Sequence, residues 1–434
     1  MSKQNLKPPR GTRDLYPEDQ RFREWLFGHF REIGRRFAFE EVDAPIVEHA
    51  ELFMRKAGEE IVDQLYHFEL HGRHLALRPE MTPSIARMVM ARAGGLRMPI
   101  RWFTITQNWR YERMSRGRKR EHYQWNMDIY GEPSVTAEAE LIAAVVALVD
   151  AVGLAKGDVK IRLNSRGLLE ETLRAGALRD RPEVFESLCV VIDKIGKIGP
   201  DKVVDMLVDP SGEVGLDPSA AREVVQLLSL SSLDDAIHAA PKDSTAGEEL
   251  QRLWRLLEAY GIDDRMVFDA SVVRGLAYYT GVVFEAFDTG GDLRSICGGG
   301  RYDRLTSTLG GPEIPAVGFG FGDVVIGELL SDKGRLPELP RVLDDVVFAF
   351  GDEQRPAAIE VANKLRAAGR RVELILGSPK LKRVIADADR DDAKNLWMLG
   401  PDELSRGVVK CRALGSGVER EEDIASFTAE SRSA

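Results

Sequence analysis

The chain has little cysteine: three in 434 residues, Cys189, Cys297 and Cys411, all far apart. This spacing excludes a disulfide framework and a zinc cluster, and it fits a reducing compartment. No apolar run approaches the length of a membrane span, and residues 1–14 contain no apolar core or cleavage signature of a secretory signal. We therefore expect a cytoplasmic protein with no membrane partner.

The chain also lacks an excess of positive charge, because 70 Asp and Glu outnumber 60 Lys and Arg and give a net charge of −10. A protein that binds nucleic acid through a general electrostatic field is usually basic overall. Any nucleic-acid contact must therefore use local patches. One such patch lies at residues 113–120, and another includes Lys380, Lys382 and Arg383.

Two familiar kinds of site are missing as well. The sequence contains neither a Walker-type phosphate loop nor the glycine fingerprint of dinucleotide-binding folds. His67, His71 and His74 are close in sequence, but Gly72 and the surrounding alternation indicate a strand and turn. We therefore expect no metal site formed by protein side chains alone.

The length predicts two to four domains, and 44% hydrophobic with 30% charged residues is an ordinary globular composition. The patterns predict an α+β domain with an antiparallel sheet, interrupted by a helical insertion, and then a compact α/β domain with a largely parallel sheet. The expected boundaries are 1–165 and 263–332 for the two parts of the α+β domain, 166–262 for the insertion, 333–340 for a linker and 341–434 for the α/β domain.

Local signals place several elements of the first domain. Apolar residues at three- and four-residue steps predict a helix over 19–39, and a second helix is expected over 136–152. Residues 65–78 alternate, which is typical of a hairpin. After them, Thr82 and Pro83 open a helix in the N-cap and N1 order.

The most informative stretch is 101–131, where two alternating segments flank a basic loop. Read with period 2, one face of this hairpin is apolar and the other carries hydrogen-bonding groups. The polar face comprises Asn108, Arg110, Glu112, Gln124, Asn126 and Asp128, the apolar face includes Trp109, Tyr111, Trp125, Met127 and Ile129, and the loop holds Arg113, Arg116, Arg118, Lys119 and Arg120. A solvated outer face is the usual meaning of alternation. We favour a binding floor, because amides, a guanidinium and carboxylates replace the usual Lys, Glu and Thr.

Three further segments combine site-like residues with ordinary structural explanations. In 77–82, Glu80 and Thr82 stand where a strand gives way to a helix, which also describes a plain helix start. In 273–281, Arg274 adjoins two tyrosines in an apolar region, which also suits a buried ion pair. In 297–303, a glycine triplet permits close backbone approach to a ligand or another strand, or forms a tight turn or bulge.

Taken together, these segments resemble class II aminoacyl-tRNA synthetases, and within them the histidyl-tRNA synthetase family. PPRGTRDLYPED is similar to the family's N-terminal signature, and the helix and strand that end at Pro45 resemble motif 1, which implies a homodimer. WRYER with Gln124 and Asp128 resembles motif 2, while LRPEMT and RGLAYYTGVVFE resemble the stretches that bind histidine. The region from about Arg341 onward resembles an anticodon-binding domain.

The resemblance implies an enzyme that activates L-histidine with ATP and Mg²⁺ and transfers it to the 3′ end of tRNA-His. It assigns catalysis to Arg110 and Arg274 at the α-phosphate, and ATP binding to these two with Glu112 and Arg113. Histidine binding falls to Glu80, Met81, Thr82, Gln124, Asp128, Tyr278 and Tyr279, and tRNA contact to Arg116, Arg118, Lys119 and Arg120.

One position departs from the class. Motif 3 normally ends in Glu-Arg, but AVGFGFGDVVIGELL has Val324 and Val325 there. We expect an active enzyme in which another basic residue, with Arg301 as the first candidate, serves the nucleotide. The alternatives are a histidine-sensing regulatory relative, a tRNA-binding accessory protein with a degenerate site, and a class II enzyme for another amino acid.

Overall fold

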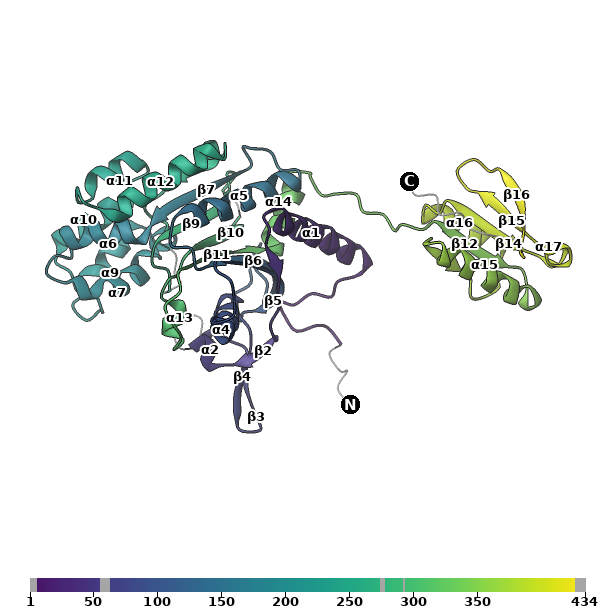
Figure 1. Cartoon of the computed structure of the whole chain (residues 1–434), viewed down its shortest axis with the longest axis horizontal. Coiled ribbons are helices and arrows are strands. Elements are labelled where there is room, and N and C mark those ends of the chain that lie inside the picture. The colour runs from purple at the N-terminus through teal and green to yellow at the C-terminus, as the bar shows by residue number, and fades with distance from the viewer. Residues whose placement is uncertain (1–5, 55–62, 274–277, 292, 426–434) are drawn as a thin grey trace. The chain divides into compact units, whose positions relative to one another are not determined.

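The computed structural model describes residues 6–54, 63–273, 278–291 and 293–425 (Figure 1). The chain divides into two compact units, Met1–Pro337 and Glu338–Ala434. None of the helices in the described ranges is long and apolar enough to cross a membrane.

An eight-stranded sheet forms the centre of the first unit, in the order β1-β5-β6-β11-β10-β9-β7-β8. Its strands are β1 (Glu40–Glu41), β5 (Ile100–Trp109), β6 (Glu121–Tyr130), β7 (Val159–Ser165), β8 (Met266–Phe268), β9 (Val282–Asp288), β10 (Cys297–Arg301) and β11 (Ala316–Gly322). Neighbours pair antiparallel except for β1 with β5 and β7 with β8. The expected antiparallel α+β architecture is confirmed.

Helices cover one face of this sheet. They are α1 (Pro17–Arg36), α5 (Thr136–Ala151), α12 (Thr245–Ala259) and α14 (Asp323–Asp332) (Figure 1). The helices expected over 19–39 and 136–152 correspond to α1 and α5. The apolar side chains of β6, Trp125, Met127 and Ile129, are buried in this layer, where Phe30 of α1 stacks on Trp125 with ring centroids 5.2 Å apart. This packing fixes the opposite face of β6 as the side that is free to build a site.

A small sheet, β2-β4-β3, projects beside the end of β5. It contains β2 (Val47–His49), β3 (His67–Leu70) and β4 (Arg73–Leu77), with α2 (Glu51–Met54) and α4 (Thr82–Arg92) next to it. The hairpin expected over 65–78 is therefore confirmed. The helix start is shifted by one residue: Met81 is the N-cap, and Thr82 and Pro83 occupy the first two helical positions.

Between β7 and β8 the chain is helical, as the sequence patterns predicted. It forms α6 (Arg166–Ala175), α7 (Phe185–Ile192), α8 (Ile195–Ile198), α9 (Pro200–Val208), α10 (Pro218–Leu228), α11 (Leu233–Ala239) and α12. Several of these helices pack on a core of their own that includes Leu173, Leu188 and Leu207.

The second unit is a five-stranded mixed sheet in the order β13-β12-β14-β15-β16. Its elements are β12 (Asp345–Ala349), α15 (Arg355–Ala367), β13 (Val372–Leu374), α16 (Leu381–Arg390), β14 (Asn395–Leu399), α17 (Pro401–Arg406), β15 (Val408–Ala413) and β16 (Glu419–Asp423). Only β12 pairs in parallel with its two neighbours, so the expected largely parallel sheet is half right. The strand β16 was not predicted, because this edge strand reads EREED and buries no regular apolar face.

Candidate functional site

The polar face of the β5–β6 hairpin is buried and not solvated. Asn126 and Asp128 are 3% and 1% exposed, and Asn108 on β5 is fully buried. The strand pairing ends at Trp109, so Arg110 and Glu112 follow the strand and do not continue its face, and Tyr111, predicted to be on the apolar face, is exposed. The predicted polar floor is therefore real over β6 and the end of β5.

Several polar atoms of this floor have no partner among the described residues. They are Thr104 Oγ1, Thr106 Oγ1, Asn108 Oδ1, Asn126 Oδ1 and Asp128 Oδ2. Buried polar atoms are normally hydrogen-bonded, and leaving one unpaired costs about 1–3 kcal/mol. A cluster of such atoms on one sheet face indicates a site for a polar ligand.

Glycines of β11 leave the space that this floor requires. A Cβ atom at Gly318 would lie 2.2 Å from Asp128 Oδ1, and one at Gly320 would lie 2.1 Å from Gln124 Nε2. The intervening Phe319 and Phe321 point to the opposite face and are buried in the helical core. The alternation of glycine and phenylalanine in AVGFGFG thus gives β11 an empty side toward the site and a filled side toward the helices.

At one end of the floor, Glu80 lies between β4 and α4. It is 5% exposed, and the Tyr278 hydroxyl donates to its Oε2 at 2.8 Å. Burial raises the pKa of Glu80, while the Arg110 guanidinium and the Tyr278 hydrogen bond act in the opposite direction. Arg110 also donates from Nε to the Pro79 carbonyl at 2.9 Å. The connection that carries Glu80 thus also accepts a hydrogen bond from Arg110, which holds the guanidinium near the carboxylate.

Asp128 forms a second acidic centre on β6. The Tyr302 hydroxyl donates to Asp128 Oδ1. Burial, with a smaller contribution from the negative charge of Glu80, raises the pKa of Asp128 to about 7, although the Tyr302 hydrogen bond acts in the opposite direction. The two carboxyl groups are therefore coupled, and together with Tyr278 and Tyr302 they form a pocket of acceptors under aromatic rings. We call these four residues the acidic pocket.

Next to the acidic pocket, the same face of the sheet borders a cavity of about 530 Å³, which extends from β6 across β11 to β10. Gln124, at 3.0 Å from the Asn108 amide nitrogen, belongs to the polar floor and also lines this cavity. Asp193, Ile195 and Gly196 of the insertion contribute to the wall.

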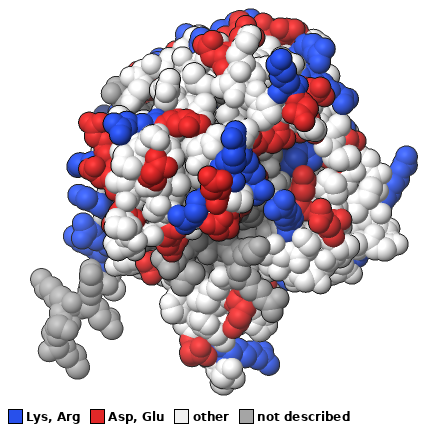
Figure 2. Space-filling view, turned by 90° about the vertical axis from the view of Figure 1, so that its left-hand side faces the viewer, with Lys and Arg blue, Asp and Glu red and all other residues white. Residues whose placement is uncertain are grey.

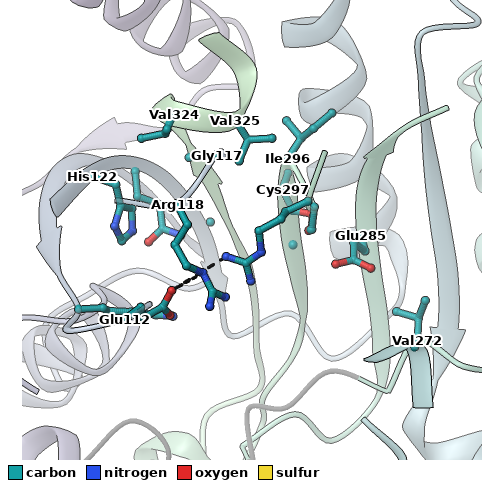
Figure 3. Close-up of a pocket in the computed structure, with 18 of the residues that line it drawn as sticks. Glu112, Gly117, Arg118, His122, Val272, Glu285, Ile296, Cys297, Val324 and Val325 are labelled. Atoms are coloured by element: carbon teal, nitrogen blue, oxygen red, sulfur yellow. Dashed lines mark hydrogen bonds and ion pairs between the residues drawn. The ribbon is translucent and has the colours of Figure 1, made fainter. Parts of the chain in front are cut away.

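Arginine side chains dominate the centre of the cavity. Arg110, Arg118 and Arg294 line it, and Arg118 forms an ion pair with Glu112 (Figure 3). Arg294 approaches the same Glu112 carboxylate at 4.0 Å. At the start of α14, Val324 and Val325 give the wall an apolar patch beside Gly117 (Figure 3).

His122 also lines the cavity. Burial, together with the charges of the Arg110 and Arg13 guanidiniums, lowers the pKa of His122 to about 3. The imidazole is therefore neutral at physiological pH and presents an uncharged ring among the arginines.

The basic loop, residues 113–120, is partnered within the chain. Arg116 bonds to Glu328, at 3.1 Å, and to Asp332 of α14, and Arg120 stacks on the Tyr111 ring with its guanidinium carbon 3.6 Å from the centroid. The N-terminal signature supports the same region, since Arg13 bridges Glu121 at 2.7 Å and Asp323 at 3.0 Å. This bridge ties the start of β6 to the start of α14.

The other predicted residues fall in different places. Arg274 lies outside the described residues. Met81, Thr82 and Tyr279 are buried close to the acidic pocket, whereas Arg113 is exposed and is not part of the cavity lining. The first candidate for the missing basic residue is wrong: Arg301 is buried and donates from Nε to Glu138 at 2.6 Å behind the sheet.

The glycine triplet 298–300 lies in β10 and not in a turn. A Cβ atom at Gly299 would be 2.4 Å from the Gly318 carbonyl oxygen, so this glycine permits close approach of another strand.

Several site residues were missed by the sequence reasoning. Tyr302 bonds to Asp128, while Gly318 and Gly320 leave room for the side chains on the neighbouring strand β6. His122 and Arg294 line the cavity. A period-2 glycine pattern in 318–322 was the one local signal that could have found the β11 positions.

Two family models match this chain. The model described as histidyl-tRNA synthetase matches residues 11–322, and the model described as anticodon binding domain matches residues 345–431.

Related proteins cover nearly the whole chain. A histidine–tRNA ligase from Arabidopsis thaliana, named chloroplastic/mitochondrial, is 49% identical over 95% of this chain and 84% of its own length. A histidine–tRNA ligase from Opitutus terrae is 40% identical over 94% of each chain. Among solved structures, histidyl-tRNA synthetase from Nostoc sp. PCC 7120 aligns with a TM-score of 0.74 and 25% identity, over 97% of each chain.

The raised pKa of Asp128 predicts a pH-dependent stability. In the unfolded chain this carboxyl ionises near pH 4, but in the folded chain it keeps its proton until about pH 7. Stability should therefore fall as pH rises from 4 to 7, by up to about 1.4 kcal/mol per pH unit. Asp128→Asn removes this titration, so we expect the variant to lose less stability than wild type between pH 5 and pH 7.

Urea unfolding followed by tryptophan fluorescence measures the effect. Asp205→Asn, on the exposed side of α9, is the matched control and should follow wild type. Equal pH slopes for wild type and Asp128→Asn would show that burial of Asp128 does not control this titration.

Proposed function

The chain belongs to the histidyl-tRNA synthetase family, and on this premise we propose how its site activates histidine with ATP and transfers it to tRNA. It is an aminoacyl-tRNA synthetase, a histidine–tRNA ligase. The observation that carries the assignment of the site is the junction of an acidic pocket with an arginine-lined cavity, joined at Gln124.

The acidic pocket suits histidine. The ligand's amine and ring N–H groups are donors, while Glu80, Asp128 and Gln124 supply acceptors in a buried setting. Tyr278 orients Glu80, and Tyr302 orients Asp128. An amino acid without a ring N–H would leave buried acceptors unpaired, which is the strongest form of discrimination by a binding site. Met81, Thr82 and Tyr279 would shape the pocket around these groups.

The arginine-lined cavity suits ATP. Negative charge develops on the α-phosphate during adenylation, and positioned cations stabilise it most effectively in a partly buried site. Arg110 adjoins Glu80 through Pro79, so its guanidinium stands at the boundary between amino acid and nucleotide. By the resemblance, Arg274 acts at the same phosphate, and Glu112 and Arg113 help to hold ATP. The neutral ring of His122 offers the base an uncharged surface.

Magnesium is expected to arrive with ATP. In the part of the chain that the structure describes, no group of three or more His, Cys, Asp or Glu could hold a metal by itself. Mg²⁺ usually takes one or two carboxylates and several phosphate or water oxygens. Glu285 lines the cavity and fits that need as a single acidic ligand, and the ion would neutralise phosphate charge.

Transfer requires the tRNA acceptor end at the same site. We assign this contact to Arg116, Arg118, Lys119 and Arg120 of the basic loop, with Lys119 and Arg118 closest to the cavity. On the face that carries the insertion helices, basic and acidic side chains lie side by side (Figure 2). Recognition of tRNA-His should therefore depend on local contacts and on the anticodon-binding unit.

A reducing compartment such as the cytoplasm suits the chain. Its three cysteines all lie in described segments, where they are buried and form no disulfide. The Arabidopsis relative carries the name of other compartments, chloroplast and mitochondrion.

Adenylation gives a direct test of the ligase function. Purified protein with Mg²⁺, ATP and labelled pyrophosphate should exchange label into ATP only when histidine is added, and not with the other amino acids. Exchange with a different amino acid would identify another class II specificity. Histidine binding without exchange would favour a regulatory subunit, and absence of magnesium-dependent ATP binding would favour an accessory protein.

Gly320→Ala tests the role of Gln124, which joins the acidic pocket to the cavity. The new methyl group would occupy the place of Gln124 Nε2, so we expect the Gln124 side chain to be displaced. Loss of a polar contact to a charged ligand should raise the histidine KM about tenfold in the exchange assay, with a smaller effect on the ATP KM. Gly28→Ala in α1, where an added Cβ meets nothing within 4 Å, is the control. An unchanged histidine KM in a folded Gly320→Ala variant would remove Gln124 from the pocket.

We also propose a homodimer, which rests on the small β2-β4-β3 sheet. Cross-strand pairing places Val47, Phe68 and Leu70 on one face, and these side chains are 42%, 40% and 48% exposed. An apolar sheet face of this kind is typically covered by a partner, here a second copy.

Sedimentation equilibrium should give twice the chain mass for wild type and a lower average for Phe68→Glu with Leu70→Glu. Leu376→Glu, at an exposed position of the second unit, is the control, and a wild-type monomer would contradict the proposal.

A further inference from the structure

The segment that leads into β10 continues the sheet past its last paired residue. Cys297 pairs with Phe321 in the antiparallel β10–β11 register, and the Gly322 amide donates to the Ile296 carbonyl at 3.3 Å. α14 begins directly after Gly322, and Arg294 lies two residues before Ile296, so this hydrogen bond brings the segment that holds Arg294 next to the start of α14. Arg294 and the first turn of α14 line the same cavity.

The part of the cavity wall that α14 contributes is apolar. Val324 and Val325 line the cavity there, and Val325 is only 7% exposed. The class II pattern places an arginine at position 325. The segment before β10 therefore supplies to the cavity a guanidinium that the helix does not.

Arg294 has no acidic partner of its own among the described residues. Its nearest carboxylate is Glu112 at 4.0 Å, and Glu112 already pairs with Arg118. Its side chain remains 48% exposed. Burial and the like charges of Arg118 and Arg110 lower the pKa of Arg294, and the negative charges of Glu112 and Glu285 only partly offset them. Guanidiniums gathered around one carboxylate repel one another, and an entering polyanion would relieve that repulsion.

Arg301 provides the contrast within the same strand region. Its guanidinium is satisfied by Glu138, Asp303 and backbone carbonyls and faces away from the cavity lining. Of the two arginines that flank β10, only Arg294 is placed to meet a ligand.

We propose that Arg294 binds the β- and γ-phosphates of ATP and replaces the arginine that is missing at position 325. This inference rests on the proposed function. Arg110 stands on the side of Glu80, where the α-phosphate must meet histidine, whereas Arg294 belongs to the segment that is hydrogen-bonded to the residue before α14. The phosphates farthest from the amino acid are therefore the ones it reaches.

Binding of ATP and of AMP to the purified full chain tests this assignment. Arg294→Ala should weaken Mg²⁺-ATP about tenfold or more in calorimetric titration, because a charge-assisted contact is lost. AMP lacks the outer phosphates, so its affinity should change less than about twofold. Arg304→Ala, which removes an exposed arginine outside the cavity, controls for net charge and should bind both nucleotides as wild type does.

Two outcomes would overturn the inference: unchanged ATP affinity in Arg294→Ala, or an equal loss for ATP and AMP. The swap Arg294→Ala with Val325→Arg should recover ATP affinity, and a folded swap variant without recovery would show that Arg294 does not replace position 325. If the swap variant does not fold, Arg294→Lys takes its place. It should keep more ATP affinity than Arg294→Ala, and equal affinities would contradict a charge contact. Direct titration keeps this test separate from the ligase function, since ATP binding is measured without histidine exchange.

Discussion

The constraint on which the rest of the site depends is the burial of the β5–β6 hairpin on both faces. One face is closed by α1 and α5, so the polar groups on the other must find partners from neighbouring elements or from a ligand. Tyr302 satisfies one oxygen of Asp128, and the β11 glycines keep room for the rest. The raised pKa of Asp128 has the same origin, because a carboxyl enclosed in this way is costly to ionise before a cationic ligand enters.

Around the cavity, some arginines have acidic partners of their own and others share one. Most arginines near the cavity already have acids within the chain: Arg13 bridges Glu121 and Asp323, and Arg116 bridges residues of α14. These ion pairs hold the basic loop against α14 and join the start of β6 to the start of α14. Because acids neutralise these arginines, they add little net positive charge to the cavity. Arg118 and Arg294 share the single carboxylate of Glu112, so positive charge is in excess around this residue.

Local patterns predicted much of this architecture. Period 2 placed Gln124, Asn126 and Asp128 on one face, and helical periodicity identified α1 and α5, because both signals come from residues near one another in sequence. The roles of Tyr302 and Gly320 depend on which strand lies beside β6, which no local pattern encodes. Arg294 and Arg301 both lie within a few residues of the glycine triplet, and only the structure shows that Arg301 is in a buried ion pair whereas Arg294 lines the cavity.

The alternation in β11 has a consequence for how this protein can change over time. Phe319 and Phe321 fill the helical core, so a smaller residue there would open a void, while any side chain at Gly318 or Gly320 would collide with the floor of the site. Substitutions are thus opposed on one side by loss of stability and on the other by loss of ligand. The residues of β11 should therefore change more slowly during evolution than others in the first unit. A new ligand specificity must come from changes in the side chains that face Gly318 and Gly320.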